Sequence, residues 1–145
     1  MRPILIVEDN DQDLELLLIA MEIGRLVNPV IRVRDGQEAL DYLLRDGAFI
    51  TRMEQDPAFV LLDLKMPRVS GFDVLVTVRE SEKLRYIPII ALTGSAQERD
   101  IARAYDLGVN GYVVKPVEFS ELVQAANAIV GMWTRHNETP PRFRS

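Results

Sequence analysis

Residues 59–71 read FVLLDLKMPRVSG: four apolar residues, then the carboxylate of Asp63, then Pro67 and Gly71. A short apolar run with branched aliphatic side chains is typical of a buried strand. An aliphatic residue could end such a strand without the cost of desolvating a charge. Asp63 therefore indicates chemistry rather than packing.

The same kind of apolar run recurs along the chain, with amphipathic segments between the runs. The other four strands are expected at Ile4–Val7, Val30–Val33, Ile87–Leu92 and Tyr112–Val114. Helices are expected from Leu14 to a stop at Gly24 and near residues 36–45, 71–81, 96–107 and 118–132. Three helices start at pairs that resemble N-terminal caps: Asp35 with Glu38, Ser70 with Asp73, and Ser95 with Glu98. This alternation predicts an α/β fold with a parallel sheet covered by helices on both faces.

The composition limits the classes of function. A chain of 145 residues, 48% of them hydrophobic and 27% charged, suits one globular domain. The net charge of −5 disfavours direct binding to nucleic acid. No apolar segment is long enough for a signal peptide or a membrane span. The absence of cysteine excludes disulfides and thiolate metal sites and agrees with a cytoplasmic location.

Polar residues stand where the predicted strands end. Glu8 and Asp9 follow the first strand, Asp63 follows the third, and Thr93 and Lys115 follow the fourth and fifth. In an open parallel sheet, ligands bind at the carboxyl ends of the strands, where the winding direction reverses. With the strand order 2-1-3-4-5, a flavodoxin-like (βα)5 arrangement, the first and third strands are neighbours at that reversal. The five side chains would then share one crevice.

Three neighbouring carboxylates repel one another unless a cation lies between them. Their ligand atoms are all oxygen, so we expect Mg²⁺ before Ca²⁺. Mg²⁺ often binds one or two carboxylates together with a phosphate. An acidic crevice beside Lys115 therefore indicates phosphoryl transfer, in which the metal and the lysine neutralise phosphoryl oxygens.

At this point the residues resemble the receiver domain of two-component response regulators. The resemblance covers about residues 3–131, and four motifs in the expected order carry it: Glu8-Asp9, Asp63-x-x-x-Pro67-x-x-x-Gly71, Thr93-Gly94 and Gly111-Tyr112-Val113-Val114-Lys115-Pro116. It implies a phosphorylation-switched signalling protein that takes its phosphoryl group from a partner histidine kinase. The only histidine, His136, lies in the tail without a kinase-like helical context, so the donor is expected to be another protein.

The resemblance assigns roles to the acidic residues. Asp63 would be the phosphoacceptor, and Asp9 would bind Mg²⁺ directly. Glu8 would help to bind the metal, either directly or through water. Asp63 and the backbone carbonyl of Lys65 would complete the protein ligands.

The resemblance also assigns the remaining pocket residues. Lys115 would pair with the phosphoryl group, and its bond to Pro116 would be cis, as in the family. Thr93 would donate its hydroxyl to a phosphoryl oxygen. Tyr112 would be the aromatic residue that changes rotamer as Thr93 moves inward.

Lys65 and the Glu8-Asp9 pair argue against two alternative functions. A Mg²⁺-dependent phosphatase with an aspartate nucleophile usually needs a second acid two residues later, where this chain has Lys65. A carrier of FMN would need a hydroxyl- and glycine-rich loop after the first strand, where Glu8-Asp9 would repel phosphate. We instead expect Lys65, with Ser95, to tune hydrolysis of the acyl phosphate.

The connection over residues 46–57 is longer than most helix-to-strand loops. Together with the absence of an appended effector domain in the sequence, it resembles the single-domain regulators that are paired with phytochrome-type sensor kinases. Many of those regulators form dimers.

The last residues are expected to serve an interface. We divide the chain into a receiver domain, residues 1–132, and a C-terminal extension, residues 133–145. Trp133 and Phe143 are large groups with no obvious place in a five-stranded core, and aromatic residues are enriched at interfaces. A two-fold homodimer through the last helix and this tail is expected, with a disordered terminus as the alternative.

Overall fold

The computed structural model describes residues 1–140. Its centre is one parallel sheet of five strands in the order β2-β1-β3-β4-β5, as the sequence predicts. The strands are β1 (Ile4–Val7), β2 (Val30–Val33), β3 (Phe59–Leu62), β4 (Ile89–Thr93) and β5 (Gly111–Val114). β1 and β3 pair in parallel, so the residues that follow these two strands lie at the same edge of the sheet.

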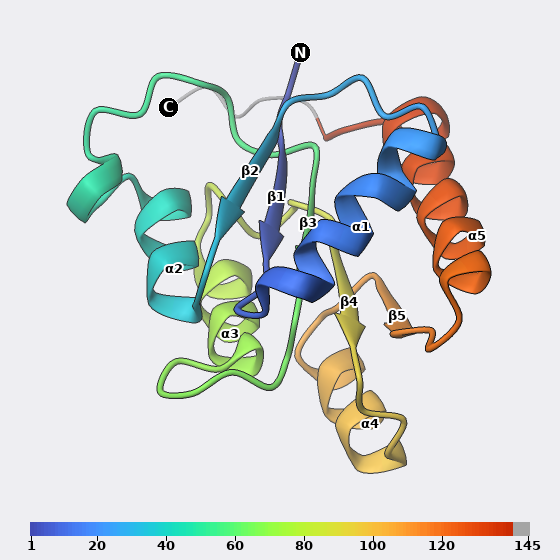
Figure 1. The fold of residues 1–145 in the computed structure, drawn as a ribbon. Helices are drawn as coiled ribbons and strands as arrows, with labels where there is room; N and C mark the ends of the chain where they lie inside the picture. Colours follow the sequence, from blue (N-terminus) through green and yellow to red (C-terminus); the bar gives the residue numbers. More distant parts are fainter. Residues whose placement is uncertain (141–145) are drawn as a thin grey trace.

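Five helices alternate with the strands, which confirms the flavodoxin-like (βα)5 fold (Figure 1). They are α1 (Asp11–Ile23), α2 (Gly36–Leu44), α3 (Gly71–Glu80), α4 (Glu98–Asp106) and α5 (Phe119–Val130). The helix α1 ends at its C-cap Gly24, the predicted stop. Among residues 1–140, no helix combines the length and the apolar character that crossing a membrane requires.

The core has one layer on each face of the sheet, because alternate strand residues point to opposite faces. Leu5, Val60 and Ala91 pack with buried residues of α2 and α3. Ile4, Phe59 and other strand residues pack with α1 and α5 on the opposite face. Figure 1 shows α1 and α5 side by side, covering that second face. The sheet therefore lies between two apolar layers.

Two of the three predicted caps are confirmed. Asp35 accepts a hydrogen bond from the backbone N–H of Glu38, and Ser70 and Asp73 form a reciprocal capping box at the start of α3. The Ser95–Glu98 cap is wrong. Ser95 gives its hydroxyl to Asp100 instead, and α4 starts at Glu98, two residues later than expected.

Helical structure continues beyond the end of α5. A π-helical segment, η2 (Gly131–His136), continues from α5. Trp133 in this segment is partly buried against the core layer of α1 and α5, and Arg135 donates to the carbonyl of Gly24 at 3.0 Å. Trp133 thus packs on the core of its own chain, a position that the sequence analysis does not predict. Phe143 lies outside the described residues.

Candidate functional site

Three carboxylates meet at the carboxyl edge of the sheet. Glu8 and Asp9 follow β1, Asp63 follows β3, and one carboxylate oxygen from each lies within 4.8 Å of the others. Glu8 and Asp63 are only 4% and 8% exposed, whereas Asp9 faces solvent. The pairing of β1 with β3 thus produces the acidic crevice that the sequence predicts.

Two hydrogen-bond donors hold one oxygen of Asp63. The hydroxyl of Thr93, at the end of β4, donates to Oδ1 at 3.1 Å, and the backbone N–H of Lys65 donates to the same atom at 3.3 Å. The ammonium of Lys115 lies 3.8 Å from the other oxygen, Oδ2. These contacts fix the orientation of the carboxylate within the crevice.

Gly71 allows the segment after Asp63 to turn closely into α3. A Cβ at this position would lie 2.4 Å from the carbonyl oxygen of Asp63 and 2.7 Å from the Cα of Leu64, which is too close for any side chain. The N–H of Gly71 also donates to the carbonyl of Leu64 at 3.1 Å. The glycine of the Asp63 motif is thus required by packing at the strand end.

Lys115 is the cation of the crevice. Its ammonium donates to a carboxylate oxygen of Glu8 and, at 3.0 Å, to Asp13, a residue of α1 to which the sequence analysis gave no role. Its backbone N–H donates to the carbonyl of Thr93 at 2.8 Å and continues the pairing of β4 with β5. Burial alone would lower the pKa of Lys115, but the hydrogen bonds to Glu8 and Asp13 outweigh burial and raise it.

The expected cis bond between Lys115 and Pro116 is wrong, since no peptide bond within residues 1–140 is cis. The trans form is the intrinsically favoured one for a bond to proline unless tertiary contacts select the cis form. Here the trans chain already delivers the ammonium of Lys115 to Glu8 and Asp13.

The crevice holds more negative charge than its single lysine balances. Burial raises the pKa of Asp63 above its ordinary value, and the nearby ammonium of Lys115 offsets only part of that rise. Burial likewise raises the pKa of Glu8, against the opposing hydrogen bond from Lys115. A group of oxygen ligands with excess negative charge fits a hard divalent cation, so the residues present suit Mg²⁺.

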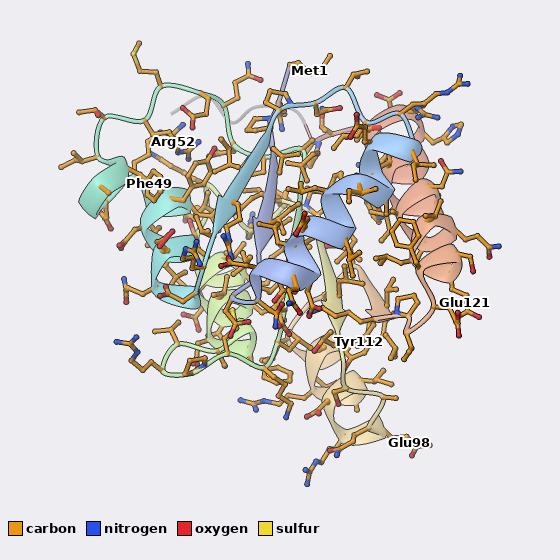
Figure 2. The ribbon with its side chains drawn as sticks, viewed as in Figure 1. Met1, Phe49, Arg52, Glu98, Tyr112 and Glu121 are labelled. Atoms are coloured by element: carbon orange, nitrogen blue, oxygen red, sulfur yellow. The ribbon has the colours of Figure 1, made fainter. Side chains whose placement is uncertain are left out.

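Tyr112 lies beside the loop that follows β4. Its hydroxyl donates to the carbonyl of Ser95 at 2.9 Å, and its ring is partly buried against the α2 and α3 layer. In Figure 2 this side chain lies above α4, and Glu98, the first residue of that helix, is labelled further down. The tyrosine is thus connected to the same loop as Thr93, and its change of rotamer stays a prediction.

Asp100 is a second polar residue to which the sequence analysis gave no role. It is only 5% exposed. Its Oδ2 accepts from the hydroxyl of Ser95 at 2.5 Å and lies 3.2 Å from the ammonium of Lys65. An acid in the first turn of a helix that follows a hydroxyl-bearing loop was the available signal, but only with the correct start of α4.

A five-stranded doubly wound sheet with three carboxylates, a threonine and a lysine at its carboxyl edge defines a class of α/β domains suited to handling phosphoryl groups. Residues 4–127 match the model of the response regulator receiver domain, and the chain belongs to this family.

Two relatives extend over most of the chain. The probable methanogenesis regulatory protein FilR2 of Methanothrix harundinacea (strain 6Ac) is 39% identical over 138 residues, which cover 94% of this chain and 86% of FilR2. The response regulator Rcp1 of Synechocystis sp. (strain ATCC 27184 / PCC 6803 / Kazusa) is 31% identical over 130 residues, covering 90% of this chain and 87% of Rcp1.

Solved structures show the same fold. The bacteriophytochrome response regulator RtBRR is 54% identical with a TM-score of 0.79, over 97% of this chain and 85% of RtBRR. The phosphorylated cyanobacterial phytochrome response regulator RcpA is 34% identical with a TM-score of 0.89, over 97% and 99% of the two chains. Rcp1 in its Mn²⁺-bound form has a TM-score of 0.88 at 29% identity, over 97% of this chain and 100% of Rcp1. Phytochrome-associated regulators are therefore among the relatives of this chain.

Proposed function

We propose that Asp63 accepts a phosphoryl group from a partner histidine kinase and that the phosphorylated chain is the signalling state. The observation that carries this proposal is the environment of Asp63. It is a buried carboxylate whose Oδ1 is fixed by Thr93 and Lys65, with the ammonium of Lys115 near Oδ2. The receiver family consists of signalling phosphoacceptors rather than enzymes with turnover, which agrees with that environment.

Glu8, Asp9 and Asp63 are proposed to bind Mg²⁺, with the backbone carbonyl of Lys65 as a further ligand. The clustering of the three carboxylates and their excess negative charge support the site, as does the Mn²⁺-bound form of the related Rcp1. When bound, the ion supplies positive charge that stabilises phosphoryl oxygens. The side chains of Thr93, at the end of β4, and Lys115, after β5, would supply hydrogen bonds to the same group.

In the proposed transfer, a carboxylate oxygen of Asp63 forms a bond to phosphorus, and the bond from phosphorus to the histidine nitrogen of the kinase breaks. The imidazole leaves with the electron pair and takes a proton from solvent. Positioning and charge neutralisation carry such a transfer, because little covalent chemistry is required of the protein. Lys65 cannot serve as the second carboxylic acid of an aspartate phosphatase, so turnover of external phosphate esters is not supported.

The switch is proposed to run from Asp63 through Thr93 to Tyr112. Phosphorylation adds about −1.5 to −2 units of charge and three strong acceptor oxygens. The Thr93 hydroxyl donates a hydrogen bond to Asp63 in this structure. It would donate to the phosphoryl group after phosphorylation. Tyr112 holds the carbonyl of Ser95, two residues along the same loop, so a shift of that loop changes its rotamer.

The partner is proposed to be a phytochrome-type kinase in the cytoplasm, on the strength of the relatives RtBRR and RcpA. A homodimer through α5 and the tail, with Trp133 and Phe143 at the interface, also remains a proposal. Since Trp133 packs on its own chain, truncation after Pro140 is the cleaner test of the tail. Light scattering should then report monomers. A truncated chain that stays dimeric would show that residues 141–145 do not contribute to the interface.

The phosphoacceptor proposal is tested with acetyl phosphate and Mg²⁺, followed by intact-mass spectrometry. The wild-type chain should gain one phosphoryl group, and Asp63→Asn should gain none. Asp73→Asn is the matched control, because Asp73 is an exposed capping residue only ten positions along the chain. Equal labelling of Asp63→Asn and wild type would refute the assignment. Co-incubation with phosphorylated candidate kinases then identifies the donor.

A further inference from the structure

Asp100 is a buried carboxylate to which the proposed phosphotransfer gives no part. It lies in the first turn of α4 with 5% of its surface exposed. Both of its side-chain partners meet at one oxygen, Oδ2: the hydroxyl of Ser95 at 2.5 Å and the ammonium of Lys65 at 3.2 Å. A buried charge with two specific partners is a fixed element of the structure rather than a solvated helix surface.

The two partners come from the two loops that hold Asp63. Lys65 follows β3, and its own N–H donates to Oδ1 of Asp63. Ser95 follows β4, two residues after Thr93, whose hydroxyl donates to that same oxygen. The Lys65 side chain therefore bridges from the loop after β3 to α4, and Asp100 fastens the far end of the bridge. The bridge thus joins the loop that carries Lys65 to the first turn of α4, beside the phosphoacceptor.

Asp100 is held in place by its own hydrogen bonds, whereas the Lys65 side chain is intrinsically flexible. Lys65 has four flexible bonds and a side chain that is 55% exposed, so without a partner it would sample many rotamers. Asp100 is held by Ser95, and the Ser95 carbonyl is in turn held by the hydroxyl of Tyr112. The hydrogen bond from Ser95, followed by the contact with Lys65, lowers the pKa of Asp100, which keeps the anchor charged at neutral pH.

We propose that Asp100 is a positioning residue that holds Lys65 across the approach of water to phosphorylated Asp63 and so lengthens the life of the acyl phosphate. The inference rests on the proposed function of Asp63. In the hydrolysis that it slows, the oxygen of water forms a bond to phosphorus and the bond from phosphorus to the Asp63 oxygen breaks. The Asp63 carboxylate leaves with the electron pair of that bond. Inorganic phosphate is released, and the proton of the attacking water passes to solvent.

The test follows loss of the phosphoryl group by intact mass after acetyl phosphate is removed from the full chain in Mg²⁺ buffer. Asp100→Asn and Lys65→Met should each speed the loss by about three- to tenfold, the size expected for releasing one partly exposed charged hydrogen bond. The double variant should lose the group no faster than the faster single variant, because both changes remove the same bridge. Asp100→Glu should restore most of the wild-type lifetime.

Glu98→Gln is the matched control, since it removes the same charge from the same turn of α4 at an exposed position. Its lifetime should equal that of the wild type. Rates that multiply in the double variant would show that Asp100 does not act through Lys65 and would overturn the inference, as would an unchanged lifetime in Asp100→Asn.

Should Asp100→Asn fail to fold, the exposed Lys65→Met variant carries the test alone, and an unchanged lifetime there overturns the inference. A wild-type chain that never gains a phosphoryl group would refute the function of Asp63 and the role of Asp100 with it. A labelled wild type with unaffected variants refutes the role of Asp100 only.

Discussion

Buried charge occurs at two ends of this molecule, and the two regions treat it differently. In the acidic crevice, Glu8, Asp9 and Asp63 cluster together, and the ammonium of Lys115 pairs with Glu8 and Asp63. In the connection between α2 and β3, the buried cation Arg52 is matched by acceptors. Figure 2 shows Arg52 and Phe49 in this connection, close to α2.

Arg52 is surrounded on several sides. Its guanidinium donates to the carbonyls of Glu54 and Gln55, pairs with Asp56 at 3.0 Å and stacks 4.2 Å from the ring centroid of Tyr42. Its Nε is the only buried side-chain nitrogen or oxygen atom among residues 1–140 that has no hydrogen-bond partner. Charge in this region is nearly balanced, so the role of Arg52 is structural. It orders the long connection between α2 and β3.

The comparison teaches that balance, rather than burial, separates a structural charge from a functional one. The partners of a balanced buried ion offset its desolvation cost, while an unbalanced cluster destabilises the fold until a ligand supplies the missing charge. The crevice is an unbalanced cluster of this kind, and binding of a cation would supply the missing positive charge.

The largest effect is expected at the balanced region. Arg52→Met should lower the free energy of unfolding by about 3 kcal/mol, because Asp56 and two loop carbonyls lose a buried donor. Urea unfolding measures the change. Arg45→Met is the control, since the Arg45 side chain is 41% exposed and should contribute about 0.5 kcal/mol. Equal losses in the two variants would break the comparison.

A smaller effect is expected when the crevice loses its cation. Lys115→Met should tighten Mg²⁺ binding by about fivefold, because the ammonium competes for the same carboxylates. Isothermal titration calorimetry measures the affinity. Lys83→Met, an exposed substitution of the same charge far along the chain, should leave it unchanged. Weaker binding in Lys115→Met would mean that the lysine organises the carboxylates rather than competing for them.

A pH effect sharpens the picture of the balanced region. Burial raises the pKa of Tyr42 to about 12. A raised pKa means that stability from the neutral phenol is complete below pH 10 and is lost as the pH rises from there towards 12.

Between pH 8 and pH 11 the wild type should therefore lose about 1 kcal/mol more of its unfolding free energy than Tyr42→Phe does. Urea midpoints at the two pH values measure the difference. Tyr105→Phe, at a tyrosine that is 51% exposed, should follow the wild type. Parallel curves for wild type and Tyr42→Phe would place the phenol of Tyr42 in contact with solvent.

Most of the fold could be predicted from local signals. The apolar runs mark the five strands to within two residues, and the pairs at Asp35 and Ser70 mark two helix starts, because both signals depend on neighbours in sequence. The crevice could also be predicted, since parallel strands bring their carboxyl ends to one edge whatever the details of packing.

The residues that were missed depend on contacts that periodicity and motif spacing do not reveal. Asp13 meets Lys115 across 102 positions, and Asp100 meets Lys65 across the gap between two loops. Arg52 is ordered by a tyrosine of α2 and by carbonyls of its own loop, which no periodicity reveals. Trp133 packs against the core from η2, a helical continuation of α5 that spacing does not predict.

The central claim, that the crevice is unbalanced, is tested most directly by urea unfolding of Asp63→Asn and wild type in a chelating buffer. Removing one buried carboxylate from the cluster should raise the free energy of unfolding by about 1 kcal/mol, although the same substitution is expected to abolish phosphorylation. A loss of stability comparable to that of Arg52→Met would contradict the account, because it would make Asp63 a balanced structural charge.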